Sequence, residues 1–205
     1  MLRVLGRTSS LNVRKVLWTL DELGLAYERE DWGQGFASVD RPEFRALNPN
    51  GLVPVLIDEA GPLWESNAIC RYLAAREGRL SPADLRARAL VDQWMDWQTT
   101  ELNQTWGYAF QALSRRVPGY DDPARIAESA EAWNGAMAIL DAQLAKTGAY
   151  VTGGDFTLAD IVLGLSAHRW KRTPIQHAAL PAVEAWYGAL RERPAMQPWA
   201  LAEVA

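Results

Sequence analysis

Short apolar runs and one amphipathic segment predict an alternating order of strands and helices in the first part of the chain. Residues 2–5 form an apolar run that predicts a strand, and residues 25–29 predict a second one. Between them a helix should end at Gly24, and a glycine-rich loop is expected over residues 31–38, before a short helix over 41–47. The apolar residues at helical spacing are Val13, Val16, Leu17, Leu20 and Leu23.

The next stretch, residues 48–72, predicts a turn, a hairpin and a helix. Residues 48–51 are a run of turn formers, and residues 53–57 are typical of a buried strand with Pro54 at its start. A hairpin connection over 58–62 should lead to a short strand at Leu63 and Trp64. Ser66 is a natural N-cap for a helix that ends near residue 77. The first 77 residues are therefore expected to form an α/β layer with a hairpin at its edge.

Beyond a linker at residues 78–82 the pattern predicts helices and no strand. One long helix should begin at Ser81-Pro82 and reach residue 116, with Gly107 as the site for a bend. Its length of about 45–50 Å exceeds what a small domain can bury, so part of it should pack against a partner. Asp122-Pro123 opens a further helix that ends before Gly148.

The last part of the chain contains the clearest helix start. Residues 157–160 form a capping box, and the helix that follows to about residue 171 is apolar nearly all round, so it should be central. A last helix is expected over residues 181–191, and Pro194 and Pro198 are expected to break the tail.

Composition narrows the function classes. An apolar fraction of 49% and a net charge of −4 argue against a disordered chain and against a nucleic-acid surface. No apolar run approaches the roughly 18 residues that a membrane span needs, and the chain enters a strand at once, which leaves no room for a signal peptide. A single cysteine, Cys70, excludes an internal disulfide framework and fits a reducing cytosol. With two histidines and one cysteine, no metal-ligand spacing is present.

The chemistry of residues 53–66 suits one end of a small peptide. The helix start at Ser66 offers unpaired N–H groups to a carboxylate, and Glu65 beside it offers a negative charge to an ammonium group. Val53, which precedes a proline, is expected to be extended and can pair its backbone with another extended peptide. Together these groups predict a site for an α-amino acid terminus.

These residues also carry a family resemblance. The Val53-Pro54 pair, followed by Trp64-Glu65-Ser66-Asn67-Ala68-Ile69, resembles the glutathione site of the cytosolic glutathione transferases of bacterial type. The resemblance implies that Pro54 is cis, that Val53 binds the cysteinyl backbone of glutathione, and that Glu65 and Ser66 hold its γ-glutamyl end. An edge-strand proline and an N-cap serine occur in many folds, but both in this order indicate the family.

The resemblance implies the fold and assembly as well. We expect a thioredoxin-like domain over residues 1–77 and an all-α domain over residues 83–205, which is the glutathione transferase fold. The family has the same capping box on the buried helix of its all-α domain. It further implies a cytoplasmic homodimer, with glutathione as co-substrate.

Two residues are candidates for activating the thiol of glutathione. In the serine-type transferases the catalytic serine precedes an arginine by four positions, which matches Ser10 and Arg14, whereas Ser9 is one residue off. Some bacterial relatives depend on an asparagine two places later, which matches Asn12. A hydroxyl or amide that donates to the sulfur would stabilise the thiolate. The alternative is that Ser10 only caps the helix.

A second pocket, for an electrophile, is expected on the long helix. Asn103, Trp106 and Phe110 recur on one face of it and are candidates to line that pocket, with plain packing as the alternative. Asp96 stands where cysteine-type bacterial transferases reach glutathione in the other subunit, and the pattern from Trp94 to Glu101-Leu102 supports that alignment. An exposed aspartate without such a role is the other reading.

Two departures from the family pattern limit the prediction. Many relatives bind the glycyl carboxylate with a lysine or arginine where this chain has Leu52, which leaves Arg41 or groups near Gln34 as candidates. There is no Cys-x-x-Cys, and Cys70 falls inside a helix, where we expect it to be part of the core. The sequence thus predicts a transferase that directs the glutathione thiol at small hydrophobic electrophiles. A glutathione-dependent disulfide oxidoreductase and a non-catalytic glutathione-binding module remain the alternatives.

Overall fold

The computed structural model describes residues 1–201 of the 205 in the chain. A four-stranded sheet has the order β2-β1-β3-β4, formed by β1 (Leu2–Leu5), β2 (Tyr27–Glu30), β3 (Val55–Asp58) and β4 (Gly61–Trp64). β1 and β2 are parallel, whereas β3 is antiparallel to both β1 and β4. The α/β layer with a hairpin edge is confirmed.

The strand boundaries differ from the prediction for local reasons. β2 begins at Tyr27, because the N–H of Leu25 still bonds to the carbonyl of Leu20 and so belongs to the end of the preceding helix. β3 begins at Val55, two residues later than predicted, because Pro54 has no N–H to give to a ladder. β4 extends back to Gly61, so the hairpin connection is shorter than expected.

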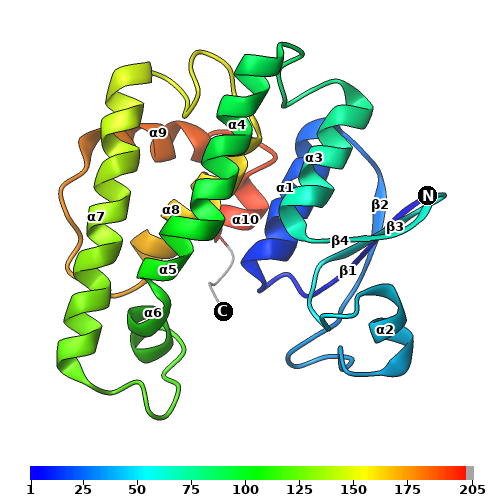
Figure 1. The fold of residues 1–205 in the computed structure, drawn as a ribbon, viewed down its shortest axis with the longest axis horizontal. Coiled ribbons are helices and arrows are strands. Elements are labelled where there is room, and N and C mark those ends of the chain that lie inside the picture. The colour runs from blue at the N-terminus through cyan, green and yellow to red at the C-terminus, as the bar shows by residue number, and fades with distance from the viewer. Residues whose placement is uncertain (202–205) are drawn as a thin grey trace.

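Helices α1 (Leu11–Leu23) and α3 (Ser66–Glu77) lie between the sheet and the helical part of the molecule, and α2 (Pro42–Leu47) lies apart from them (Figure 1). α1 packs on both α3 and α8 (Leu158–Arg172), which makes α8 the helix shared by the two halves. At their crossing a Cβ atom on Gly164 would lie 3.2 Å from the Trp18 ring and 2.8 Å from Leu190 Cδ1, so glycine lets the helices approach without displacing these side chains.

The predicted long helix over 81–116 is wrong as a single element. It divides into α4 (Leu85–Trp97), a π-helical turn η1 (Gln98–Leu102), α5 (Asn103–Thr105) and α6 (Gly107–Leu113). The bend expected at Gly107 is confirmed, since α5 ends at Thr105, Trp106 lies between the two helices, and α6 begins with Gly107. The Thr105 hydroxyl donates to the carbonyl of Leu102, 2.8 Å away, which offers that carbonyl a partner at the break.

The start of this segment also differs from the prediction. Asp84, not Ser81, is the N-cap of α4, because its carboxylate accepts from the N–H of Ala87 at 2.8 Å. The linker is held elsewhere: the carbonyl of Leu80 accepts from the N–H of Leu158 at the start of α8, at 2.9 Å. One of the unpaired N–H groups of α8 is thereby satisfied by the linker itself.

Helices α7 (Pro123–Thr147), α8 and α9 (Pro181–Arg191) follow the predicted order, whereas the short α10 (Gln197–Leu201) was not predicted. The capping box of α8 is confirmed. The tail is not broken throughout, since Pro198 lies in the first turn of α10, where a missing N–H costs little. Of the predicted all-α domain, residues 202–205 lie outside the described part of the chain.

Candidate functional site

The start of β3 and the start of α3 meet because of the strand register. Val55 of β3 lies opposite Trp64 of β4, so the residues just before β3 run beside those just after β4. This places Val53 and Pro54 next to Glu65 and Ser66, which are far apart only in sequence. The Val53–Pro54 peptide bond is cis, as the resemblance implied.

Glu65, rather than Ser66, is the N-cap of α3. Its backbone has φ of 76°, a region that residues other than glycine seldom adopt. From there the carboxylate accepts from the N–H groups of Asn67 at 3.1 Å and Ala68 at 2.8 Å. Ser66 is instead the first residue of the helix and is only 4% exposed. The prediction of Ser66 as the cap was wrong, because the longer glutamate side chain can reach two N–H groups from this strained position.

A hollow of about 130 Å³ lies where these segments meet. It contains four residues predicted to bind glutathione, and Asn12 reaches it from α1. The lining residues are Asn12, Asn48, Asn50, Leu52, Val53, Pro54, Trp64, Glu65 and Ser66. Amide side chains, one carboxylate and several apolar residues thus converge on a small site.

Ser10 is not among the residues that line this hollow. It is the N-cap of α1, with extended backbone, but its side chain makes no capping hydrogen bond. The hydroxyl of Ser10 therefore does not support the alternative that this residue serves only to cap the helix. Asn12, by contrast, is exposed and lines the hollow.

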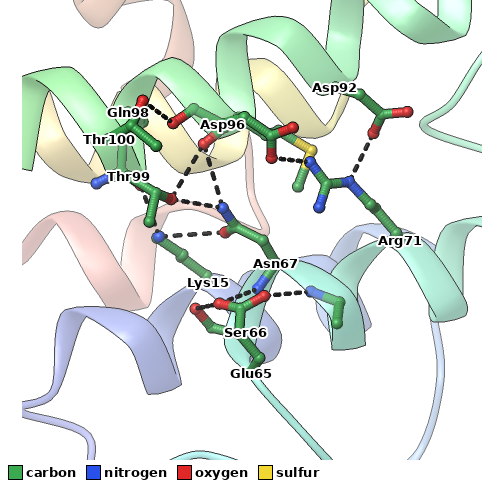
Figure 2. A network of polar contacts seen from close by, with 12 residues as sticks. Lys15, Glu65, Ser66, Asn67, Arg71, Asp92, Asp96, Gln98, Thr99 and Thr100 are labelled. Atoms are coloured by element: carbon green, nitrogen blue, oxygen red, sulfur yellow. Dashed lines mark hydrogen bonds and ion pairs between the residues drawn. The ribbon is translucent and has the colours of Figure 1, made fainter.

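Lys15 is a buried charged residue that the sequence analysis missed. It is 2% exposed, and its ammonium donates to Asn67 Oδ1 at 3.2 Å and Gln98 Oε1 at 2.9 Å, as Figure 2 shows. Asn67 in turn donates to Thr99 Oγ1 at 3.1 Å and to the carbonyl of Met95 at 3.2 Å. The network ties α1 and the first turn of α3 to α4 and η1, directly behind Glu65 and Ser66. No pattern around Lys15 indicated burial, because its amide partners are 52 and 83 residues away.

The burial of Lys15 is expected to make stability rise with pH. Burial lowers the pKa of Lys15 from 10.5 to about 8, so above that pH the unfolded chain holds more protons than the folded one. Relative to Lys15→Met, the wild-type free energy of unfolding should therefore rise by on the order of 2 kcal/mol between about pH 7.5 and about pH 9.5. Urea denaturation at the two pH values measures this, and a difference that does not change with pH would contradict it.

Asp96 lies on α4 and takes part in an ion-pair group rather than in the hollow. Arg71 of α3 pairs with Asp92, at 2.6 Å, and with Asp96 (Figure 2). The Asp96 side chain is 63% exposed, so it remains accessible to solvent beside Arg71. Within one chain, Asp96 therefore does not join the other predicted binding residues.

The three predicted pocket residues lie around the break between α5 and α6. Asn103 Oδ1 accepts from Trp106 Nε1 at 3.1 Å and from Gln98 Nε2 at 2.9 Å, which fixes the indole. The Trp106 and Phe110 rings meet edge to face, with centroids 5.4 Å apart. Phe110 has no exposed surface, so it can only support a pocket wall. The guanidinium of Arg169 lies over both rings, a contact that the sequence did not suggest.

The residues considered for the glycyl carboxylate are dispersed. Leu52, at the position where many relatives have a lysine or arginine, lines the hollow and is 64% exposed. It therefore offers no positive charge to the glycyl carboxylate. Arg41 pairs with Glu43 at 3.5 Å, and Gln34 Oε1 accepts from Arg7 at 3.5 Å. Neither candidate lines the hollow.

Cys70 is part of the core, as expected. Its side chain is fully buried and accepts a hydrogen bond from Thr19 Oγ1 at 3.3 Å. Burial raises the pKa of this thiol to about 11, so it stays protonated and is a poor nucleophile. Within residues 1–201, no group of histidine, cysteine, aspartate and glutamate side chains is arranged to hold a metal ion. Over the same residues, every helix is too short or too polar to cross a bilayer.

Comparisons with known proteins agree with this geometry. Residues 9–76 match the model of the glutathione S-transferase N-terminal domain, and residues 123–189 match that of the C-terminal domain. The chain is 38% identical to glutathione S-transferase GstB of Escherichia coli, over 96% of both chains. It is 29% identical to the disulfide-bond oxidoreductase YfcG of the same organism, covering 90% of this chain and 87% of that one.

A solved structure shows the same arrangement. The theta class glutathione S-transferase of Xanthomonas axonopodis pv. citri, with glutathione bound, superposes with a TM-score of 0.92 at 42% identity and covers 100% of this chain and 99% of its own. The two matching domain models, the curated relative and this structure all point to one family. The chain belongs to the glutathione S-transferase family.

Proposed function

We propose that this chain is a glutathione transferase whose glutathione lies in the hollow between β3 and α3. The observation that carries the proposal is the convergence of Asn12, Val53, Glu65 and Ser66 on one site. The Xanthomonas relative was solved with glutathione bound, which supports the same ligand here. In the proposed complex the backbone of Val53 pairs with the cysteinyl residue, and Pro54 shapes the chain at this point.

The γ-glutamyl end of glutathione would meet the first turn of α3. Its α-carboxylate suits the N–H and hydroxyl groups at Ser66, because a helix start carries partial positive charge. Its α-ammonium suits the carboxylate of Glu65, which is exposed at the rim. Lys15 lies behind this turn and adds a buried positive charge on the side of the carboxylate.

Activation of the glutathione thiol accounts for only part of the expected rate enhancement. With a thiol pKa of about 8.5, roughly 3% is thiolate at pH 7, and lowering the pKa by two units raises that to about three quarters. A thiolate of lower pKa is a weaker nucleophile, which lowers the rate about eightfold and so cancels much of this increase. Most of the rate must therefore come from holding an electrophile beside the sulfur.

Ser10 and Asn12 are the proposed donors to the sulfur, and the position of Asn12 in the hollow favours it as the principal one. We expect Asn12→Ala to lower kcat about tenfold and Ser10→Ala to lower it less, with little change in the KM for glutathione. Ser38→Ala, at an exposed serine in the loop before α2, is the matched control. Steady-state kinetics with an activated aryl halide measure this. A larger loss in Ser10→Ala than in Asn12→Ala would reverse the two roles.

Conjugation of glutathione to an activated aryl halide by the purified protein tests the proposed function directly. Turnover above the uncatalysed rate supports it. Glutathione binding without turnover of a halide or a small disulfide would indicate a non-catalytic module instead. A titration that shows no glutathione uptake at millimolar concentration would exclude both.

A glutathione-dependent disulfide oxidoreductase is the second candidate. It is favoured by the similarity to YfcG and by the presence of Asn12, rather than Ser10, in the hollow. With Cys70 buried and protonated, bound glutathione would have to supply every reacting sulfur. Reduction of a small disulfide, with no activity towards halides, would select this candidate.

The assembly belongs to the same proposal. We place the protein in the cytosol as a homodimer, in which the exposed Asp96 of one subunit reaches the glutathione of the other. An electrophile would then bind between Ser10 and Trp106, with the buried Phe110 supporting the wall behind Trp106.

A further inference from the structure

Four arginines gather where the loop after β1 faces the helical half of the molecule, and we call them the arginine cluster: Arg7, Arg14, Arg115 and Arg169. Two of them hold the loop that leads to Ser10. Arg7 Nε donates to Ser9 Oγ at 3.0 Å, and Arg14 Nε donates to the carbonyl of Thr8 at 2.6 Å. Positive charge therefore flanks the segment that would face the glutathione sulfur.

The other two arginines share one aromatic ring. The guanidinium of Arg169 lies 4.7 Å from the Phe110 centroid and 4.4 Å from that of Trp106. The guanidinium of Arg115 lies 5.2 Å from the same Phe110 centroid. Both charges therefore contact residues that were predicted to line the second pocket.

Arg169 is the buried member of the cluster. It is 8% exposed, and its Nε is buried with no hydrogen-bond partner among the residues that the structure describes. Burial, together with the charges of Arg115 and Arg14, lowers its pKa to about 9. Burial lowers the pKa of Arg7, and the charge of Arg115 lowers it as well, so Arg7 also senses this positive charge. Like charges held this close destabilise one another, and an anion placed among them would offset that cost.

Building on the proposed function, we propose that the arginine cluster selects an electrophile that carries a carboxylate. Arg115, which is exposed, would bind the carboxylate through the paired N–H groups of its guanidinium, with Arg169 behind it. Trp106 would pack against the apolar part of the molecule. The reacting carbon then points towards the loop before Ser10, where the sulfur lies.

The reaction itself is an ordinary displacement with the carboxylate unchanged. The glutathione thiol gives its proton to the buffer, and the sulfur forms a bond to the electrophilic carbon. The carbon–halogen bond breaks, and the halide leaves with the bonding electron pair.

A matched pair of aryl chlorides tests the proposal: 4-chloro-3-nitrobenzoate and its methyl ester. The two differ in charge at one position, and each enzymatic rate is divided by its own uncatalysed rate to remove their difference in reactivity. We expect the rate enhancement to be larger for the acid. Arg115→Met should raise the KM for the acid about tenfold and leave the KM for the ester and for glutathione within twofold. Arg116→Met, at the neighbouring exposed arginine outside the cluster, should change none of these values.

Three results would overturn the inference. Equal or greater enhancement for the ester would remove the preference for a carboxylate. If Arg115→Met lowered the activity towards the acid and the ester equally, the charge of Arg115 would act on the glutathione thiolate rather than on the carboxylate of the electrophile. If Arg115→Met raised the KM for glutathione, Arg115 would bind the glycyl carboxylate of glutathione instead. Turnover of the ester with any of these results leaves the proposed function standing, whereas no turnover of either chloride by the wild type contradicts both. Unchanged melting temperatures confirm that the variants fold.

Discussion

Replacing Glu65 by glutamine is expected to raise the KM for glutathione about 10- to 100-fold, with kcat changed only a few-fold. A hydrogen bond to a charged partner contributes about 1.5–3 kcal/mol, and the amide has no charge to hold the α-ammonium group. The glutamine oxygen still accepts from an N–H of Asn67 or Ala68, so much of the helix cap remains. Glutathione-saturation kinetics at fixed electrophile measure the effect.

The control for this variant is Glu59→Gln. Glu59 is exposed on the connection between β3 and β4 and carries the same charge change. An unchanged KM in Glu65→Gln would place the ammonium group elsewhere and contradict the proposed binding mode. A large fall in melting temperature in Glu65→Gln, with KM unchanged, would show that Glu65 serves the fold alone.

Replacing Asp160 by alanine is expected to destabilise the protein by at least about 4 kcal/mol, because several buried hydrogen-bond donors lose their acceptor at once. The carboxylate is fully buried and accepts from Val151 N at 2.9 Å, Thr157 N at 2.9 Å and Trp186 Nε1 at 3.0 Å. The Thr157 hydroxyl also donates to it, at 3.1 Å. This one side chain joins the loop before α8, the start of α8 and α9. Urea denaturation of the purified variant measures the loss.

Asp160→Asn keeps the measurement possible if the alanine variant does not fold. Burial raises the pKa of the Asp160 carboxyl, so a neutral side chain of the same shape is tolerated better than none. We expect it to lose about 1–2 kcal/mol, since one acceptor oxygen remains. Asp155→Ala, at an exposed aspartate of the same loop, should lose less than about 0.5 kcal/mol. Equal stability of Asp160→Ala and Asp155→Ala would contradict the role of Asp160.

Much of the candidate site was predictable because its parts are local. The turn at residues 48–51, Pro54 and the Glu65-Ser66 helix start all depend on neighbours within a few residues, and the hairpin register brings them together. The identity of the cap was not predictable in the same way. Serine is the commoner cap, whereas here Glu65 adopts a positive φ and its longer side chain caps the helix.

The sequence by itself determined the order of strands and helices, the caps at Asp122 and Thr157, the bend at Gly107 and the core position of Cys70. Only the tertiary structure decided that the long helix divides at η1, that Lys15 is buried, and that Arg169 lies over Trp106 and Phe110. The physical reason is the range of the interactions. Caps, turns and apolar periodicity act over a few residues of chain, whereas the burial of a charge depends on which distant segments supply its partners.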